Sequence, residues 1–282
     1  MQVTPDSLVE NNPRISSLPE IFYLINEVIS DPESSFGDVA QVISNDTSLS
    51  LRLLKIVNSP FFNFPQKIDT ITHAISVVGT EQLRDLALAT SVLTRFKGIT
   101  DPKIDMNSFW RHSLGCGIAT RVLAHQCRQP NAERYFLTGM VHDVGRLILF
   151  ENLSEKASKV LTRESPDEPP LVDRERDLIG FHHGDIGGAL CRAWNLPPLL
   201  EHVITNHHNP EKAEDFFLET AILHLGNLIT IAMELGNSGD VYIPPLDETM
   251  WKRIGLTPGH LSAIWKQVSI QFDETASVIL TG

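Results

Sequence analysis

The sequence has few cysteines and no excess of positive charge, and both shortages narrow the range of functions. Its 282 residues include three cysteines, Cys116, Cys127 and Cys191, and no CxxC pair. Neither a disulfide framework nor a thiolate zinc site is therefore indicated, and we expect each cysteine to be a small buried residue. The formal net charge of −12 opposes nonspecific binding to nucleic acid or to an anionic membrane.

Long apolar runs and an apolar N-terminus are also lacking. No stretch approaches the roughly 18 consecutive apolar residues of a membrane-spanning helix. The opening residues, MQVTPDSLVENNP, are too polar and acidic for a secretory signal. The chain is nevertheless 42% hydrophobic and long enough to build a substantial core. We therefore expect a cytoplasmic protein that does not insert into a membrane.

Apolar residues recur at helical rather than alternating spacing, which predicts an all-α fold. We expect a polar tail over residues 1–16, an N-terminal helical lobe over 17–98 and a second helical lobe over 99–282, because the stretch from Ile99 to Asn107 is polar and contains a proline. The expected helices cover about 17–30, 36–44, 48–57, 72–78, 81–96, 108–126, 136–150, 155–163, 172–179, 183–194, 198–207, 214–234, 247–254 and 258–280.

The stretch Gly139–Arg146, GMVHDVGR, places a histidine and a carboxylate side by side inside an apolar run. Burying an unpaired carboxylate costs several kcal/mol, so Asp143 needs a hydrogen-bond partner or a cation. Neutral imidazole together with carboxylate suits Zn, Fe, Mn or Ni. The pair alone is weak evidence for a metal, and its meaning depends on where the other histidines lie.

Helical spacing places several other histidines on apolar faces, and these are His112, His183, the pair His207 and His208, and His224. A single inward histidine is more often a satisfied core residue than a ligand. Four such faces beside a buried His–Asp pair favour a shared metal, because ligation offsets the cost of desolvating each imidazole. Four other histidines have mixed or polar neighbours and are expected at the surface: His73, His125, His202 and His260.

Several long motifs occur in an order that resembles a known family. In the first lobe these are SLPEIFYLINEVISDPESSFGDVAQVISNDTSLSLRLLKIVNSPFF and ITHAISVVG, and in the second FWRHS, GMVHDVGRLILF, LIGFHHGDIGGALCRAWNLP and the closing histidine pair. Together they resemble the HDOD family, a helical signalling module of bacteria within the HD superfamily of metal-dependent phosphohydrolases. The resemblance covers nearly the whole chain after the expected tail.

The resemblance implies a centre of one or two divalent transition metal ions, with Fe or Mn favoured. One ion would be held by His112, His142 and Asp143. The second would be held by Asp143, as a bridge, together with His183, His207 and His208. At the position of the aspartate that normally completes the first site, this chain has Asn227, which is an uncharged and poorer ligand. His224, one turn earlier, is an alternative ligand or an outer partner.

Two functions remain open at this point. The related HD-GYP phosphodiesterases have Lys at the position of Arg146 and a Gly-Tyr-Pro segment where this chain has Asn209-Pro210, which argues against cyclic-di-GMP hydrolysis. Arg146 either binds a phosphate oxygen or has a structural role, as a salt bridge or an exposed charge. The resemblance favours a regulatory module with a metal centre, acting with a signalling protein or a small phosphorylated ligand. The alternative is an active phosphohydrolase or phosphodiesterase in which Asp143 and Arg146 are catalytic. The acidic charge disfavours DNA binding.

Overall fold

The computed structural model of the protein describes residues 3–12, 15–59, 61–62, 64–96, 104–162, 168–240, 243 and 248–280. Over these residues the fold is all-α and contains no strand, as the helical spacing predicts. The expected boundary between the lobes falls partly outside them, because residues 97–103 are not described.

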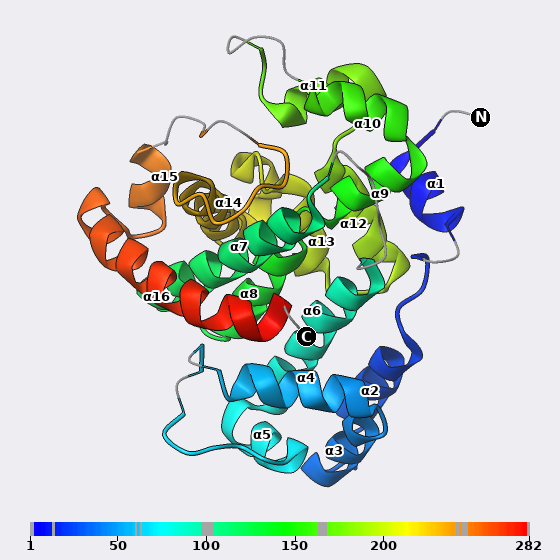
Figure 1. Cartoon of the computed structure of the whole chain (residues 1–282), viewed down its shortest axis with the longest axis vertical. Coiled ribbons are helices and arrows are strands. Elements are labelled where there is room, and N and C mark those ends of the chain that lie inside the picture. Colours follow the sequence, from blue (N-terminus) through cyan, green and yellow to red (C-terminus); the bar gives the residue numbers. More distant parts are fainter. Residues whose placement is uncertain are drawn as a thin grey trace.

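The helices form a small N-terminal lobe and a larger second lobe, which lie at the bottom and the top of Figure 1. The small lobe contains α2 (Glu20–Ser30), α3 (Phe36–Ser44), α4 (Thr47–Val57) and α5 (Ile71–Val78), and α6 (Thr80–Phe96) leads out of it. The larger lobe contains α7 (Met106–Gln126), α8 (Ala132–Val141), α9 (Val144–Asn152), α10 (Ser154–Leu161), α11 (Leu171–Ile179), α12 (His183–Ala193), α13 (Pro198–Asn206), η1 (Pro210–Phe216), α14 (Phe217–Ala232), α15 (Glu248–Arg253), η2 (Pro258–His260) and α16 (Leu261–Leu280).

Short polar side chains set the starts of several helices where the sequence indicates them. The Ser35 hydroxyl accepts the Asp38 backbone N–H, and the Asp38 carboxylate accepts the Ser35 N–H in return. One start differs from the prediction, because α2 begins at Glu20 and not at Ser17. Pro19 disfavours helical geometry at the preceding residue and itself takes an extended conformation, with ψ of 140°.

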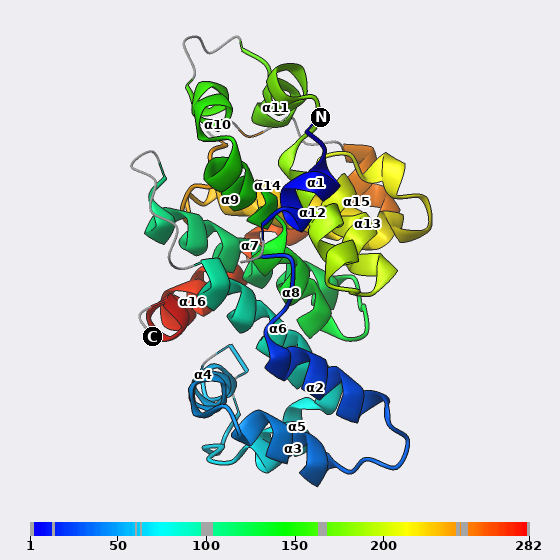
Figure 2. The ribbon, with the colours of Figure 1, turned by 90° about the vertical axis from the view of Figure 1, so that its right-hand side faces the viewer.

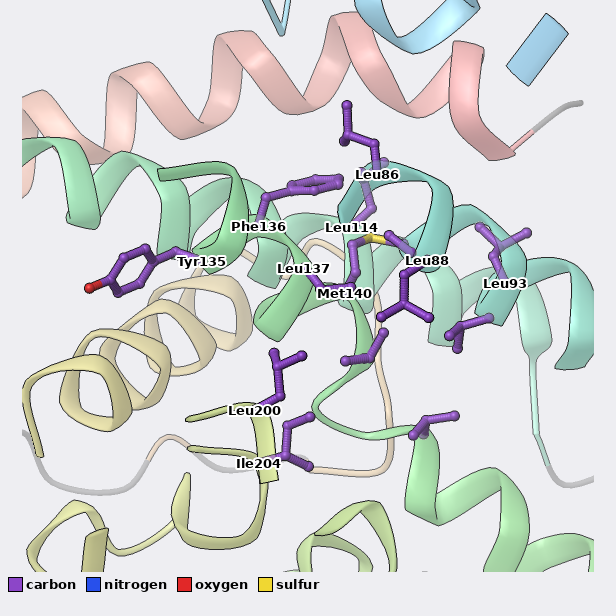
Figure 3. Close-up of a cluster of buried hydrophobic side chains, with 14 of the residues drawn as sticks. Leu86, Leu88, Leu93, Leu114, Tyr135, Phe136, Leu137, Met140, Leu200 and Ile204 are labelled. Atoms are coloured by element: carbon purple, nitrogen blue, oxygen red, sulfur yellow. The ribbon is translucent and has the colours of Figure 1, made fainter. Parts of the chain in front are cut away.

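Helix α6 joins the two lobes through one continuous core. Figure 3 shows side chains of α6, among them Leu86, Leu88 and Leu93, beside Leu114 of α7 and Met140 of α8. All of these side chains are buried. A second connection runs from Arg121 of α7, whose guanidinium donates to the Phe61 carbonyl oxygen (3.2 Å) and lies 4.1 Å from the centre of the Phe61 ring.

The N-terminal segment is not the polar tail that the sequence suggests. Residues Pro5–Glu10 form helix α1, capped by Thr4, and the side chains of Leu8 and Val9 are buried. Figure 2 shows α1 against the larger lobe, where it contacts α12 and α9. Asp6 pairs with Arg192 at 2.7 Å. The composition of this segment is polar, but its two apolar side chains, Leu8 and Val9, are enough to pack a six-residue helix against the larger lobe.

Truncating Leu8 tests whether α1 is part of the folded domain. We expect Leu8→Ala to lower the free energy of unfolding by about 2–3 kcal/mol, because a buried leucine loses its packing and leaves a cavity. Chemical denaturation measures the change, and Glu10→Ala, at an exposed position of the same helix, is the control. Equal stability of Leu8→Ala and the wild type would mean that α1 is detached in solution.

One helical span is longer and more apolar than we expect from the sequence. Pro210–Ala232, which joins η1 and α14, is long and apolar enough to cross a membrane by length and composition, so the expectation that no stretch qualifies is wrong. In the fold, 56% of its apolar window is buried, and α14 packs against α7 and α13. The span therefore has the surroundings of a core helix, for which the same composition is required.

Candidate metal centre

The segment that carries His142 and Asp143 is a break between two helices and not the continuous helix predicted over 136–150. Helix α8 ends at Val141 and α9 begins at Val144. Asp143 takes φ −98° and ψ 4°, outside regular helix geometry. The flanking glycines permit close backbone contacts, because a Cβ on Gly145 would lie 2.0 Å from the His183 carbonyl oxygen. The break directs the Asp143 side chain into the core between α8, α9 and α12.

The two carboxylate oxygens of Asp143 face two different groups of histidines. Oδ2 lies 3.2 Å from His142 Nε2 and 3.6 Å from His112 Nε2. Oδ1 lies 3.1 Å from His183 Nε2 and 3.9 Å from His207 Nε2. Asp143 and these four histidines are all buried, with exposed fractions of 0–1%.

His208 completes the second group. Its Nε2 lies 2.9 Å from His183 Nε2, and the side chain is half-buried. The structure thus brings the predicted residues together in two sets, His112 with His142 and Asp143, and Asp143 with His183, His207 and His208. Within each set the candidate ligand atoms lie within 4.8 Å of one another.

Hydrogen bonds on the far side of the rings turn bare nitrogens toward Asp143. The Nδ1 atoms of His142 and His207 lie 2.8 Å and 2.7 Å from backbone carbonyl oxygens, which accept only, so these nitrogens carry the protons. The Nε2 lone pairs therefore point at one another and at a carboxylate. His142 Nε2, His112 Nε2 and both Asp143 oxygens have no hydrogen-bond partner. A buried cluster of imidazole nitrogens and carboxylate oxygens that lack hydrogen-bond partners fits a bound cation.

The electrostatic surroundings hold His112, His207 and Asp143 in protonation states that suit ligation, and the other two buried histidines differ. Burial lowers the pKa of His142, but Asp143 outweighs this and holds it well above its usual range. Burial and Arg146 lower the pKa of His183, but Glu175 and Asp143 outweigh them and raise it. Burial lowers the pKa of His112 to about 4, although Asp143 acts in the opposite direction. Burial and the neighbouring His142 and His183 hold the pKa of His207 well below its usual range. Burial raises the pKa of Asp143, but Arg146 and His142 outweigh this and hold it well below its usual range. Neutral imidazole and ionised carboxylate are the forms that bind divalent metals.

Arg146 lies beside this cluster as a buried, paired cation. Its guanidinium donates to the carbonyl oxygen (2.7 Å) and hydroxyl (3.1 Å) of Ser238 and to Asp240 Oδ2 (2.5 Å). Its Nε is 3.5 Å from Asp143 Oδ1, and only 1% of the side chain is exposed. Of the two roles predicted for Arg146, the salt bridge is the one present in this arrangement. A direct role in catalysis stays a prediction.

Three residues of the site were not predicted from the sequence. Glu175 accepts His183 Nδ1–H at 2.6 Å, while Ser238 and Asp240 hold Arg146. The burial of Glu175 could have been predicted, because Glu175 lies at helical spacing from Val172 and Ile179 on one face of α11. The contacts of Ser238 and Asp240 could not have been predicted, because both residues belong to a short polar segment more than 90 residues from Arg146 in sequence.

The two remaining candidates lie on α14. Asn227 is buried, and its Oδ1 has no hydrogen-bond partner. His224 is half-buried, and its Nδ1 donates to the His207 carbonyl oxygen at 2.8 Å. Among the described residues neither ligand set includes His224, so its geometry is that of an outer partner. Three of the histidines expected at the surface, His125, His202 and His260, are exposed, and His73 is half-buried.

A pocket of about 420 Å³ adjoins the second set of histidines. Its lining includes His208, His224 and Asn227. Helix α11 supplies one wall through Leu171, Val172, Asp173, Arg174 and Arg176, and α14 contributes Leu228 and Ile231. A small molecule bound in this pocket would contact His208, so the cluster is accessible from this side.

Comparison with known proteins matches most of the chain to one domain family. Residues 15–210 match the family described as HDOD domain. An uncharacterised protein of Treponema pallidum (strain Nichols) is 26% identical over 214 residues, which cover 74% of this chain and 41% of that protein. The chain therefore spans about two fifths of the length of this curated relative.

Solved structures share the fold at low identity. A protein of Shewanella amazonensis SB2B, provisionally named a phosphohydrolase, has a TM-score of 0.73 at 22% identity, and the match covers 96% of both chains. A protein of Marinobacter aquaeolei VT8, provisionally named a signal transduction protein, has a TM-score of 0.75 at 18% identity, over 99% of this chain and 62% of that one. At these identities the likeness establishes the helical fold.

Proposed function

The chain belongs to the HDOD domain family, and we propose that it is a bacterial, cytoplasmic signal-transduction module built around a dinuclear metal centre. The observation that carries the proposal is Asp143, whose two buried oxygens each face a separate group of histidine nitrogens. A carboxylate in this position is suited to bridge two divalent ions. Iron or manganese is the metal we favour, from the family resemblance.

A metal centre of this composition would link distant parts of the larger lobe. His112 comes from α7, His142 and Asp143 from the break after α8, His183 from the start of α12, and His207 and His208 from the end of α13. Ions held by all four segments would fix these helices relative to one another. Loss or gain of an ion would then alter the surface that the module presents to a signalling protein.

The pocket beside His208 favours a second candidate function, hydrolysis of a phosphoester such as a nucleotide. Divalent ions at such a centre acidify bound water and stabilise charge on a phosphoryl group. In this chain Asp143 would hold the ions, and Arg146 would keep Asp143 ionised and oriented from 3.5 Å away. The same pocket suits a small phosphorylated ligand that is bound and not cleaved, which is the version that fits the signalling proposal.

Metal content and turnover test the two functions together. We expect the purified protein, loaded aerobically and anaerobically, to contain up to two transition metal ions per chain by elemental analysis. No metal under either condition would refute the centre. Turnover across a panel of nucleotides and phosphodiesters that stops on chelation and returns on reloading would favour the enzyme. Absence of turnover with metal bound would favour the signalling module.

A further inference from the structure

Glu175 gives one of the two ligand sets a support that the other lacks. Its Oε2 accepts both the Nδ1–H of His183 (2.6 Å) and the His183 backbone N–H (2.9 Å). The Glu175 side chain is buried, with 3% of its surface exposed. A carboxylate behind a histidine ligand fixes the ring and makes the opposite nitrogen a stronger electron donor. His183 is therefore a stronger ligand than an imidazole supported by an uncharged acceptor.

The first ligand set has no comparable support. His142 Nδ1 donates to the uncharged Gly139 carbonyl, and His112 Nδ1 is buried without any hydrogen-bond partner. Among the described residues, no hydrogen bond to Nδ1 fixes the tautomer of His112 or raises the donor strength of its ring. The two histidines that share Asp143 Oδ2 are thus weaker ligands than the carboxylate-supported His183.

The number and charge of the ligands add to this difference. The second set offers three imidazoles and Asp143 Oδ1, which makes four ligand atoms from the protein. The first set offers two imidazoles and Asp143 Oδ2. Asn227, the residue that the sequence places at this set, supplies an amide oxygen that is buried without a partner but carries no charge to bind a divalent cation.

We infer that the two sites bind ions with unequal affinity and that Glu175 is the positioning residue which sets the order. The site of Asp143, His183, His207 and His208 fills first and keeps its ion. The site of His112, His142 and Asp143 fills second and exchanges its ion. This inference rests on the proposed metal centre and concerns its regulation.

The exchangeable ion would be held in part by helix α7. His112 lies on α7, the same helix whose Arg121 holds the Phe61 carbonyl of the N-terminal lobe. Helix α7 also packs along α8, α14 and α16. Binding or loss of an ion at the first site would therefore act on the helix that contacts both lobes. The ion of the second site would hold α12 and α13 in place.

Calorimetric titration of the metal-free protein with Mn²⁺ tests the order. We expect two steps in the wild type. Glu175→Gln keeps an acceptor for the ring N–H but removes the charge, so it should weaken the tight step about 10–100-fold and leave the weak step in place. His112→Ala should abolish the weak step and leave the tight one. Asp177→Asn, an exposed carboxylate of the same helix, should change neither.

The outcomes separate this inference from the proposed function. Two equal steps in the wild type, loss of the tight step in His112→Ala, or an unchanged tight step in Glu175→Gln would each overturn the inference and leave the metal centre standing. A merely structural role of Glu175 would weaken both steps alike and would lower the unfolding temperature of the metal-free protein. Absence of any metal binding by the wild type would overturn the proposed function itself.

Discussion

Asp143→Asn should strongly weaken the binding of both metal ions. Asparagine has one uncharged oxygen in place of two charged ones, and its NH₂ group would face histidine nitrogens on one side of the cluster. Each side has a protein nitrogen within 3.2 Å of an Asp143 oxygen, so the amide cannot suit both. We expect each apparent dissociation constant to rise about 100-fold or more, which equilibrium dialysis with elemental analysis measures.

The shared position of Asp143 distinguishes this variant from other ligand substitutions. His112→Ala removes a residue of one set only, whereas Asp143→Asn removes a residue common to both. Asp177→Asn makes the same chemical change at an exposed position and should keep the wild-type metal content. If Asp143→Asn still bound one ion tightly, Asp143 would not be a bridge, and the two sets would be independent sites.

Arg146→Met should destabilise the metal-free fold by about 3–5 kcal/mol. The guanidinium is fully buried and pairs with Asp240 and Asp143, and its Nε lies 4.0 Å from Glu175. Its removal would leave three carboxylates around an apolar side chain, and breaking a buried ion pair from one side carries a cost of this size. Urea denaturation in the presence of a chelator measures the difference in the free energy of unfolding.

A double variant shows whether the cost arises from unpaired charge. Arg146→Met combined with Asp240→Asn removes one of the stranded carboxylates, so it should be more stable than Arg146→Met alone. Arg192→Met, at an arginine whose ion pairs are about half exposed, should cost less than 1 kcal/mol. Full stability of Arg146→Met with a loss of phosphoester binding would instead indicate that the guanidinium serves a ligand.

The helical fold and the burial of several histidines were largely predictable because both leave periodic signals. Apolar spacing gave α3 the bounds that the structure shows, 36–44, and it placed most of the other helices within three residues. The histidines at positions 112, 183 and 207 lie on apolar faces, and the structure buries them as predicted. A histidine at a core position of an amphipathic helix is visible in sequence because its neighbours at three and four residues are apolar.

The features that the sequence did not predict depend on contacts between distant segments. Asp240 forms an ion pair with Arg146, which lies 94 positions earlier in the sequence, and no local sequence pattern predicts this pairing. The break at His142 and Asp143 depends on the packing of α9 against α12 at Gly145. Local helix propensity does not predict this packing. Helix α1 docks through two side chains, too few to distinguish it from a polar tail. Burial of Glu175 was readable from its helical face, but its hydrogen bond to His183 was not.

The two-ion centre is tested most directly by anomalous scattering from crystals of the metal-loaded protein. We expect one peak between Asp143 and the pair His112 and His142, and a second between Asp143 and the histidines at 183, 207 and 208. At partial occupancy the second peak should be the stronger of the two. Crystals of protein loaded with Mn²⁺ or Fe²⁺ that show no anomalous peak within coordination distance of Asp143 would contradict the two-ion centre.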